Sequence, residues 1–277
     1  MSDLKDIRII FSDIDGTLLP FAGKDLSRTA GLLRDLIEAG YLFVPCTGRG
    51  TENIPKEILS LPGLRYVITA NGALITDLTT GEVLYKKVLS RELARSITRA
   101  LRPFRGSAYL YRHGVHHLDV TDRLDLGPVS GTFAAWVNTA VRIDFLRLLE
   151  REGWDEIDKM GLACLDPAEQ KDAAAALRTY SWYPELTVSS SAYWNIEINA
   201  RGGSKGPASL WLASRLGFAP DQMLAAGDNY NDLSMLQAAG ISVAPENAVE
   251  EVRRNVSFVV PDCCEDGVEN FLRQLLA

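Results

Sequence analysis

The sequence predicts an α/β fold, in which a doubly wound, Rossmann-like parallel sheet is interrupted by an inserted α+β domain. Three observations support this prediction. Short apolar runs end in polar or glycine-containing turns, helical patterns lie between these runs, and the middle of the chain changes to less apolar segments. Alternation of strands and helices implies right-handed crossovers and a sheet with helices on both faces.

Four apolar runs are expected to form strands of the sheet. They cover residues 7–11, 41–45, 66–68 and 224–226. Continuous apolar runs of this length, rich in Ile and Val, are typical of strands buried on both faces of a parallel sheet.

Three helices are expected from capping residues and terminal glycines. They cover about residues 27–40, 204–217 and 231–240. Ser27 and Ser204 are expected to cap the first two, because a serine side chain at this position accepts a hydrogen bond from a free backbone N–H.

The middle of the chain, residues 79–200, has a different pattern and predicts an inserted domain. Alternating segments at 108–111 and 193–198 indicate strands. Helices are expected after Ser90 and over residues 139–150. The predicted core therefore consists of residues 1–78 and 201–277.

Length and composition limit the classes of protein to consider. The chain has 277 residues, of which 47% are hydrophobic and 23% charged, as in ordinary globular proteins. Its formal net charge of -7 argues against nucleic acid or an anionic membrane as the main partner. The four cysteines show no metal-ligand spacing, and the N-terminus lacks a signal-peptide pattern. We expect a cytoplasmic protein, and the sequence leaves its oligomeric state open.

Polar residues follow three of the expected strands directly. Asp13, Thr47 and Asp228 each come within two residues of an apolar run. In doubly wound sheets, reactive groups gather at the carboxyl ends of the strands. These three side chains are therefore expected to be neighbours in space.

The segment Asp13-Ile14-Asp15-Gly16-Thr17 places two carboxylates two residues apart. Carboxylates this close repel each other unless a cation or a shared proton compensates, and Mg²⁺ prefers oxygen ligands. One carboxylate can attack phosphorus, and another can protonate the leaving oxygen. We assign Asp13 as the nucleophile and Asp15 as the general acid/base; the alternative is a solvated turn.

Two further segments are candidates for holding a phosphate. Thr47 and Gly48 offer a hydroxyl and a backbone N–H after the second strand, and Arg49 either binds substrate or covers the sheet edge. Lys205 lies at the start of an expected helix, where a cation is disfavoured unless an anion lies nearby. The alternatives are an ordinary turn and a solvated surface lysine.

A second acidic cluster follows the last of the four strands. Asp228 is expected to complete a metal site, Asp232 to bind the metal through water, and Asn231 to donate to phosphate. The alternative is an N-cap cluster at a helix start, and both descriptions can hold for Asp232.

These segments, in this order, resemble the four motifs of the haloacid dehalogenase-like superfamily. The matching residues are Asp13 and Asp15, then Thr47, then Lys205, then Asp228, Asn231 and Asp232. The position of the insertion resembles the type-IIB cap, or Cof-like, subgroup, and so does the Asn71-Gly72-Ala73 segment that precedes it.

The resemblance implies a Mg²⁺-dependent phosphatase that forms an aspartyl-phosphate on Asp13. Its substrate would be a small phosphorylated metabolite, such as a sugar, glyceryl or cofactor phosphate. The metal would lie on Asp13, on the backbone oxygen of Asp15 and on Asp228, and Asn71 would lie on the phosphate side. A phosphomutase on the same fold and a non-catalytic phosphate-binding protein are the alternatives.

Substrate specificity is expected to come from the inserted domain. Glu197 or Asn195, on one face of an expected strand, is the best candidate to contact a substrate hydroxyl, although packing is the commoner role for such residues. Further candidates are Tyr109, Tyr111, His113, His116, His117, Arg142, Trp182 and Trp194.

Overall fold

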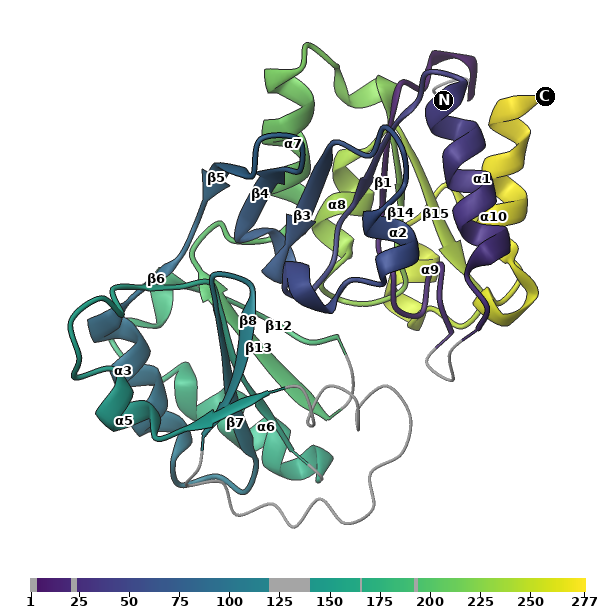
Figure 1. Ribbon diagram of the computed structural model, residues 1–277. Coiled ribbons are helices and arrows are strands. Elements are labelled where there is room, and N and C mark those ends of the chain that lie inside the picture. Colours follow the sequence, from purple (N-terminus) through teal and green to yellow (C-terminus); the bar gives the residue numbers. More distant parts are fainter. Residues whose placement is uncertain (1–3, 21–23, 120–139, 165, 192–193) are drawn as a thin grey trace. The chain divides into compact units, whose positions relative to one another are not determined.

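The computed structural model divides the chain into two compact units, drawn in Figure 1. The core unit comprises Met1–Tyr85 and Ser204–Ala277, and the inserted unit comprises Lys86–Gly203. The roles of catalytic core and cap, predicted for residues 1–78 with 201–277 and for residues 79–200, stay predictions. The structure describes residues 4–20, 24–119, 140–164, 166–191 and 194–277.

The core unit contains a five-stranded parallel sheet in the order β16-β15-β14-β1-β2. Its strands are β1 (Ile9–Ser12), β2 (Leu42–Pro45), β14 (Met223–Ala226), β15 (Ile241–Pro245) and β16 (Phe258–Val260). The two ends of the sequence therefore meet in one sheet, since β1 pairs with β14 as well as with β2. This arrangement confirms the predicted parallel-sheet core.

Helices cover both faces of this sheet, as Figure 1 shows. One face packs against α1 (Ser27–Glu38) and α10 (Gly267–Leu272), and the other packs against α7 (Lys205–Arg215) and α8 (Leu233–Ala238). Strand β1 supplies both cores, because successive side chains of a strand point to opposite faces. Ile10 joins the first core, whereas Ile9 and Phe11 join the second. The short helices α2 (Lys56–Leu59) and α9 (Glu250–Arg254) complete the unit.

The run at residues 66–68 forms a strand, but its placement in the parallel sheet was wrong. Strand β3 (Tyr66–Thr69) belongs to a separate three-stranded sheet with β4 (Leu74–Asp77) and β5 (Glu82–Lys86), and it pairs antiparallel with β4. A single parallel bridge from Ile68 to Cys46 connects it to the end of β2. The tight turn after β3 reverses the chain, and its residues Ala70, Asn71 and Gly72 all have positive φ.

The helix starts differ in detail from the predictions. Ser27 is the first residue of α1 and not its cap, because the Asp25 carboxylate accepts a hydrogen bond from the Ser27 N–H at 3.0 Å. Ser204 does occupy the N-cap position of α7, but its side chain makes no capping hydrogen bond. Helix α8 is shorter than residues 231–240, because the preceding residues form the turn of the site.

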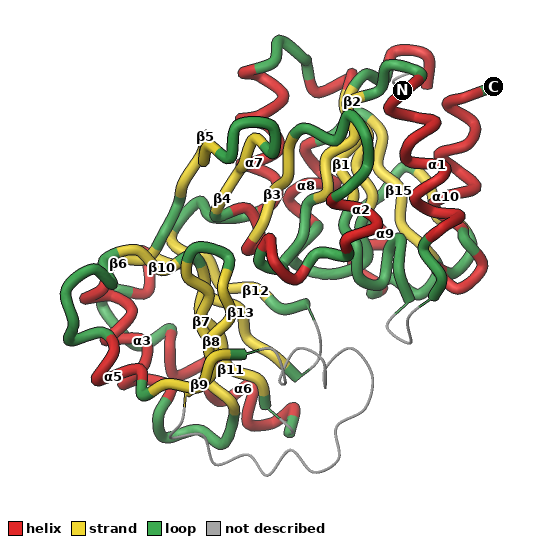
Figure 2. The backbone as a smooth tube through the Cα atoms, viewed as in Figure 1, coloured by secondary structure: helices red, strands yellow, loops and turns green. Residues whose placement is uncertain are grey.

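The inserted unit is built on a six-stranded sheet in the order β12-β13-β11-β7-β8-β9, shown in Figure 2. Its helices α3 (Arg91–Leu101), α5 (Phe145–Leu148) and α6 (Pro167–Leu177) share an apolar core with one face of this sheet. The strands are β7 (Ser107–Arg112), β8 (Val115–Asp119), β9 (Val141–Ile143), β11 (Lys159–Ala163), β12 (Leu186–Ser189) and β13 (Asn195–Ala200), and the short strands β6 (Leu89–Ser90) and β10 (Glu156–Ile157) form a separate pair. The helix predicted after Ser90 is confirmed, since the Ser90 hydroxyl accepts from the Leu93 N–H at 3.2 Å.

The helix predicted over residues 139–150 was wrong in its first half. Val141 and Ile143 are β-branched and alternate in strand β9, which pairs parallel with β8. Asp144 then caps α5 by accepting from two backbone N–H groups, so the helix begins only at Phe145. Residue 139, like residue 193 of the predicted strand 193–198, lies outside the described residues.

The described helices are short. The longest, α1, has 12 residues, whereas a helix that crosses a bilayer needs about 20 apolar residues. No helix in the described part of the chain has the length and apolar character for such a crossing.

The packing of α1 on the parallel sheet should dominate the stability of the core unit. Leu36 is fully buried in this interface, so Leu36→Ala should lower the free energy of unfolding by about 2–5 kcal/mol in urea denaturation. Leu210→Ala in α7 is the matched control, because this leucine is 38% exposed and its loss should cost less than about 1 kcal/mol. Equal losses in both variants would contradict the assigned core.

Candidate active site

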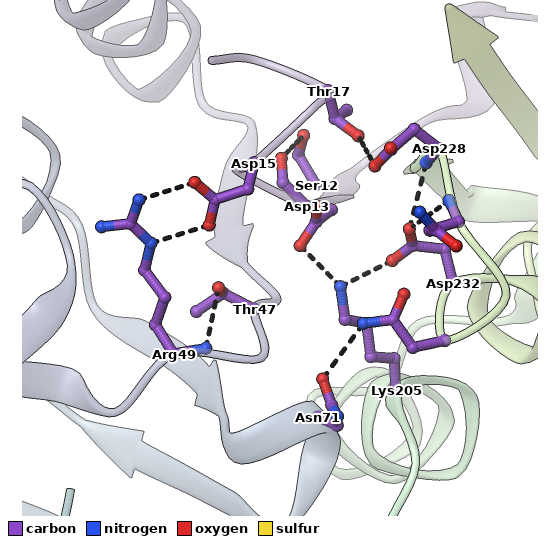
Figure 3. Close-up of polar contacts among 12 residues, drawn as sticks. Ser12, Asp13, Asp15, Thr17, Thr47, Arg49, Asn71, Lys205, Asp228 and Asp232 are labelled. Atoms are coloured by element: carbon purple, nitrogen blue, oxygen red, sulfur yellow. Dashed lines mark hydrogen bonds and ion pairs between the residues drawn. The ribbon is translucent and has the colours of Figure 1, made fainter. Parts of the chain in front are cut away.

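The loops that follow β1, β2 and β14 meet at the carboxyl edge of the parallel sheet. They bring together Asp13, Thr47 and Asp228, and Lys205 joins them from the start of α7 (Figure 3). Residues more than 200 positions apart thus become neighbours, as the strand-end pattern predicts. All of these residues belong to the core unit.

Lys205 lies at the centre of the site and is fully buried. Its Nζ donates to Asp13 Oδ1 and to Asp232 Oδ1, each at 2.6 Å. The structure thus excludes the solvated surface lysine that the sequence left open. Burial alone would lower the Lys205 pKa, but the charges of Asp13 and Asp232 outweigh it and raise the pKa well above its usual value. The side chain therefore remains a cation.

Asp13, Asp228 and Asp232 form a cluster of three buried carboxylates, which we call the carboxylate cluster. Each offers one oxygen, and these three oxygens lie within 4.8 Å of one another. Asp228 Oδ1 also accepts from the Thr17 hydroxyl at 3.1 Å. The loop after β1 can lie this close to Asp228 only because residue 16 is a glycine. Gly16 has φ +81°, and a Cβ there would lie only 2.4 Å from Asp228 Oδ2.

Asp232 has a structural role in addition to its contact with Lys205. Its Oδ2 accepts from the backbone N–H groups of Asp228 and Asn229, both at 3.0 Å. It therefore closes the turn that presents Asp228. Asp232 also occupies the N-cap position of α8, as the alternative expects, but its side chain makes no capping hydrogen bond. Its binding of a metal through water stays a prediction.

The charges of the cluster do not balance within the protein. Three ionised carboxylates and one ammonium group leave two negative charges in a region from which water is largely excluded, which is costly. A divalent cation bound by oxygen ligands would neutralise them, so the donor set fits Mg²⁺.

The pKa values of the buried carboxyl groups reflect this charge imbalance. Burial raises the pKa of Asp13 to about 7 although Lys205 opposes this, and burial, then the charges of Asp232 and Asp13, raise the pKa of Asp228 well above its usual value.

Asp15 points away from the carboxylate cluster and toward Arg49 (Figure 3). Arg49 Nη2 donates to Asp15 Oδ1 at 2.6 Å, and Arg49 Nε donates to Asp15 Oδ2 at 2.7 Å. The two carboxylates of the first motif therefore have different partners, because Asp13 is bound to Lys205. The roles of Asp15 as acid/base and as a metal ligand through its backbone stay predictions.

Thr47 is held in place by its backbone and presents its hydroxyl at the end of β2. Its Oγ1 accepts from the Arg49 N–H at 3.1 Å, and its carbonyl accepts from the Asn71 N–H at 3.0 Å. The hydroxyl hydrogen is then available to donate to a bound oxygen. Thr47 and Gly48 as phosphate ligands stay predictions that this geometry permits.

Asn71 and Asn231 form a buried amide pair beside Lys205. Asn231 Nδ2 donates to Asn71 Oδ1 at 3.2 Å. Asn71 Nδ2 and Asn231 Oδ1 have no hydrogen-bond partner among the described residues, although both residues are at least nine-tenths buried. A buried donor without a partner is costly, so the Asn71 amide suits an incoming acceptor such as a phosphoryl oxygen.

Sequence reasoning missed two residues of this site. Thr17 binds Asp228, and it could have been found because it lies in the Asp13–Thr17 segment itself. Asn247 had no such signal: its Nδ2 donates to the Gly16 carbonyl at 2.7 Å, and its Oδ1 accepts from the Cys263 N–H at 2.9 Å. It therefore fastens the loop that contains Asp15 to the C-terminal part of the core unit.

In the inserted unit, Glu197 forms a buried ion pair that the sequence did not reveal. Lys159 Nζ lies 2.6 Å from Glu197 Oε1, and both side chains are less than 5% exposed. The ammonium group also lies 5.0 Å from the centre of the Tyr111 ring, and this ring stacks on His116. The predicted contact of Glu197 with substrate stays a prediction.

A comparison with known protein families identifies the chain. The model of the haloacid dehalogenase-like hydrolases matches residues 10–272. The chain belongs to this family. The match includes the Asp13 and Asp228 loops and the whole inserted unit, so the resemblance inferred from four short segments is confirmed.

Individual members of the family are similar over almost their whole length. Phosphatase YwpJ of Bacillus subtilis is 30% identical over 98% of this chain and 100% of its own length. The 5-amino-6-(5-phospho-D-ribitylamino)uracil phosphatase YwtE of the same organism is 27% identical over 98% of this chain and 99% of its own. The solved structure of a subclass IIB sugar phosphatase has a TM-score of 0.80 at 20% identity, covering 96% of this chain and 98% of that one. The predicted fold and the prediction of a phosphatase of this family are confirmed.

The buried charge predicts how the stability of the metal-free protein depends on pH. The Asp13 pKa is about 7 in the folded protein, against its usual value of 3.8. Between these values the folded state keeps a proton that the unfolded chain has released, so stability falls as the pH rises from about 4 to about 7. Asp13→Asn removes this contribution. In urea denaturation with EDTA, the wild type should lose more stability than Asp13→Asn between about pH 5 and pH 8, by more than about 1 kcal/mol.

Addition of Mg²⁺ is the companion measurement to this prediction. At about pH 8 the ion should raise the midpoint of wild-type unfolding, because it binds the folded carboxylates, and should raise that of Asp13→Asn much less. Parallel pH profiles for the two proteins, together with no effect of Mg²⁺, would contradict the charge imbalance.

Proposed function

We propose that this phosphatase is Mg²⁺-dependent and hydrolyses small phosphomonoesters through an aspartyl-phosphate on Asp13. The observation that supports this most is the carboxylate cluster, in which three buried carboxylates are balanced by only one cation, Lys205 at the start of α7. Asp13 and Asp228 would hold the ion, together with the backbone oxygen of Asp15. When bound, Mg²⁺ would supply the positive charge that lets an anionic phosphate approach a carboxylate.

Asp13 is the nucleophile of the proposed reaction. Lys205 Nζ donates to Asp13 Oδ1 and so holds the carboxylate at the start of the loop that follows β1. Attack on phosphorus forms a bond between the carboxylate oxygen and phosphorus and breaks the bond to the ester oxygen. The product of this half-reaction is an acyl phosphate, which water then cleaves to regenerate the carboxylate.

Asp15 is the proton donor and acceptor of the proposed reaction. It gives a proton to the ester oxygen as the alcohol leaves, and it takes a proton from the water that attacks the acyl phosphate. Its side chain is 27% exposed, so water reaches it more readily than it reaches Asp13, whose side chain is 9% exposed.

The phosphoryl oxygens would be held by groups that converge from three loops. Thr47 offers its hydroxyl, Asn71 its unpartnered amide and Lys205 its charge. Preorganised donors of this kind stabilise the charge that develops on the transferring group.

The substrate class is inferred from the relatives and from the inserted unit. One relative is named for a phosphorylated ribityl compound, and the solved neighbour is a sugar phosphatase. Glu197, which pairs with Lys159 in the inserted unit, is kept as the proposed contact for a substrate hydroxyl. We therefore infer a sugar, sugar-alcohol or cofactor phosphate as the substrate.

The proposal is tested by phosphate release from a panel of phosphorylated metabolites with and without Mg²⁺. Wild-type protein should release inorganic phosphate only with the metal, and Asp13→Asn should lower the turnover by at least about 10³-fold, because no acyl phosphate forms. The matched control is Asp35→Asn, which changes an aspartate of α1 that has no place in the site. Activity that survives in Asp13→Asn would contradict the assigned nucleophile.

The same assay separates the alternatives. A phosphomutase would return the phosphoryl group to substrate and release little phosphate. A phosphate-binding protein would show no turnover of any ester, while still binding inorganic phosphate. Either result would contradict the proposed function.

A further inference from the structure

The Asp15 carboxylate is held by both of its oxygens. Arg49 binds them with Nη2 and Nε at 2.6 and 2.7 Å, as the paired dashed lines in Figure 3 show. A guanidinium group is a flat and rigid fork, so paired bonds of this kind fix the plane of the carboxylate as well as its position.

Arg49 is itself fixed from three further directions. Its remaining terminal nitrogen, Nη1, donates to the Asn53 carbonyl at 2.5 Å. Its backbone N–H donates to Thr47 Oγ1, and its carbonyl accepts from the Ala70 N–H at 2.9 Å. Arg49 is therefore held firmly to the core unit, and its guanidinium group fixes the orientation of the Asp15 carboxylate.

Stability alone does not explain the pair. The side chains of Arg49 and Asp15 are 22% and 27% exposed, so water still reaches both groups and weakens their attraction. The contribution of the Arg49–Asp15 pair is geometric, because it fixes the position of the Asp15 carboxylate. A proton can pass only when donor and acceptor are within about 3 Å of each other, and a carboxylate on a surface loop otherwise rotates freely.

We propose that Arg49 is a positioning residue that holds Asp15 in the orientation required for proton transfer. The inference rests on the proposed function, in which Asp15 is the acid/base, and it replaces direct substrate binding as the role of Arg49. In the first half-reaction a proton moves from an Asp15 oxygen to the ester oxygen, while the bond between the ester oxygen and phosphorus breaks. In the second, the water oxygen bonds to phosphorus while the bond between phosphorus and the Asp13 oxygen breaks, and a proton from the water passes to Asp15.

The inference predicts a dependence on the leaving group. An alkoxide is a strong base and leaves phosphorus readily only when protonated, whereas p-nitrophenolate leaves without a proton. Loss of orientation at Asp15 should therefore slow the transfer from an alkyl phosphate more than the transfer from p-nitrophenyl phosphate. The value of kcat/KM reports the first half-reaction for both substrates, since it includes steps only up to release of the alcohol.

The experiment measures the ratio of kcat/KM for the best alkyl phosphate of the panel to kcat/KM for p-nitrophenyl phosphate. In Arg49→Ala the ratio should fall by about 10- to 100-fold, which is part of the roughly 10²- to 10⁴-fold that a general acid supplies. Arg49→Lys should show a similar fall, because lysine keeps the charge but not the fork. Any fraction of misfolded protein cancels in the ratio, since both substrates are measured on one preparation.

Two controls complete the design. Arg65→Ala removes another arginine of the core unit that pairs with an aspartate, Asp77 at 3.1 Å, and should leave the ratio unchanged. Asp15→Asn should lower the ratio at least as much as Arg49→Ala. The double variant Asp15→Asn, Arg49→Ala should lower it no further than Asp15→Asn, because the two residues act as one unit.

Three results would overturn the inference. An equal fall of kcat/KM for both substrates in Arg49→Ala would assign Arg49 to direct binding of the phosphoryl group. Additive effects in the double variant would separate Arg49 from Asp15. If Arg49→Lys keeps the wild-type ratio of kcat/KM values, a positive charge at residue 49 is sufficient and the fork geometry is not needed. Failure of the proposed function would look different, because the wild type would then release no phosphate from either ester.

Discussion

The site depends on the burial of three carboxylates around one lysine. Lys205 neutralises only one of the negative charges of Asp13, Asp228 and Asp232, and all four side chains lie at or below a tenth exposed. Such an arrangement is unfavourable unless a further positive charge enters it. The raised pKa values of Asp13 and Asp228 have the same origin, since burial and the neighbouring carboxylates both favour the protonated form of a carboxyl group. The way the fold buries these groups therefore favours either a protonated carboxyl group or a bound cation.

The parallel sheet is the reason that these charges can be assembled at all. Strands β1 and β14 are buried on both faces and pair with each other, so the loops at their carboxyl ends cannot separate without exposing the cores. The free energy of the apolar packing therefore holds together groups that repel one another. Gly16 lets the first loop approach Asp228 closely, and Asp232 closes the second by accepting from two backbone N–H groups.

Sequence reasoning succeeded where local patterns determine the structure and was incomplete where partners are distant. The apolar runs indicated β1, β2 and β14, and their polar ends indicated which side chains meet. The pattern could not show that β3 leaves the parallel sheet, since this depends on the positive-φ turn after it. Nor could it show the partners of Asp15 and Glu197, because Arg49 and Lys159 are ordinary basic residues until folding places them 2.6 Å from a carboxylate.

The two ion pairs of the first motif differ in exposure, and the difference matches their proposed tasks. A nucleophile gains from a region that excludes water, because electrostatic interactions with the transferring group are strongest there. Asp13 and the fully buried Lys205 meet this condition. An acid/base must instead exchange its proton with substrate and water in every cycle, so it has to remain accessible. Asp15 is partly exposed, and a fixed arginine supplies the orientation that packing cannot supply at such a position. Two aspartates two residues apart can thus serve opposite requirements because the chain turns between them and gives each a different cation.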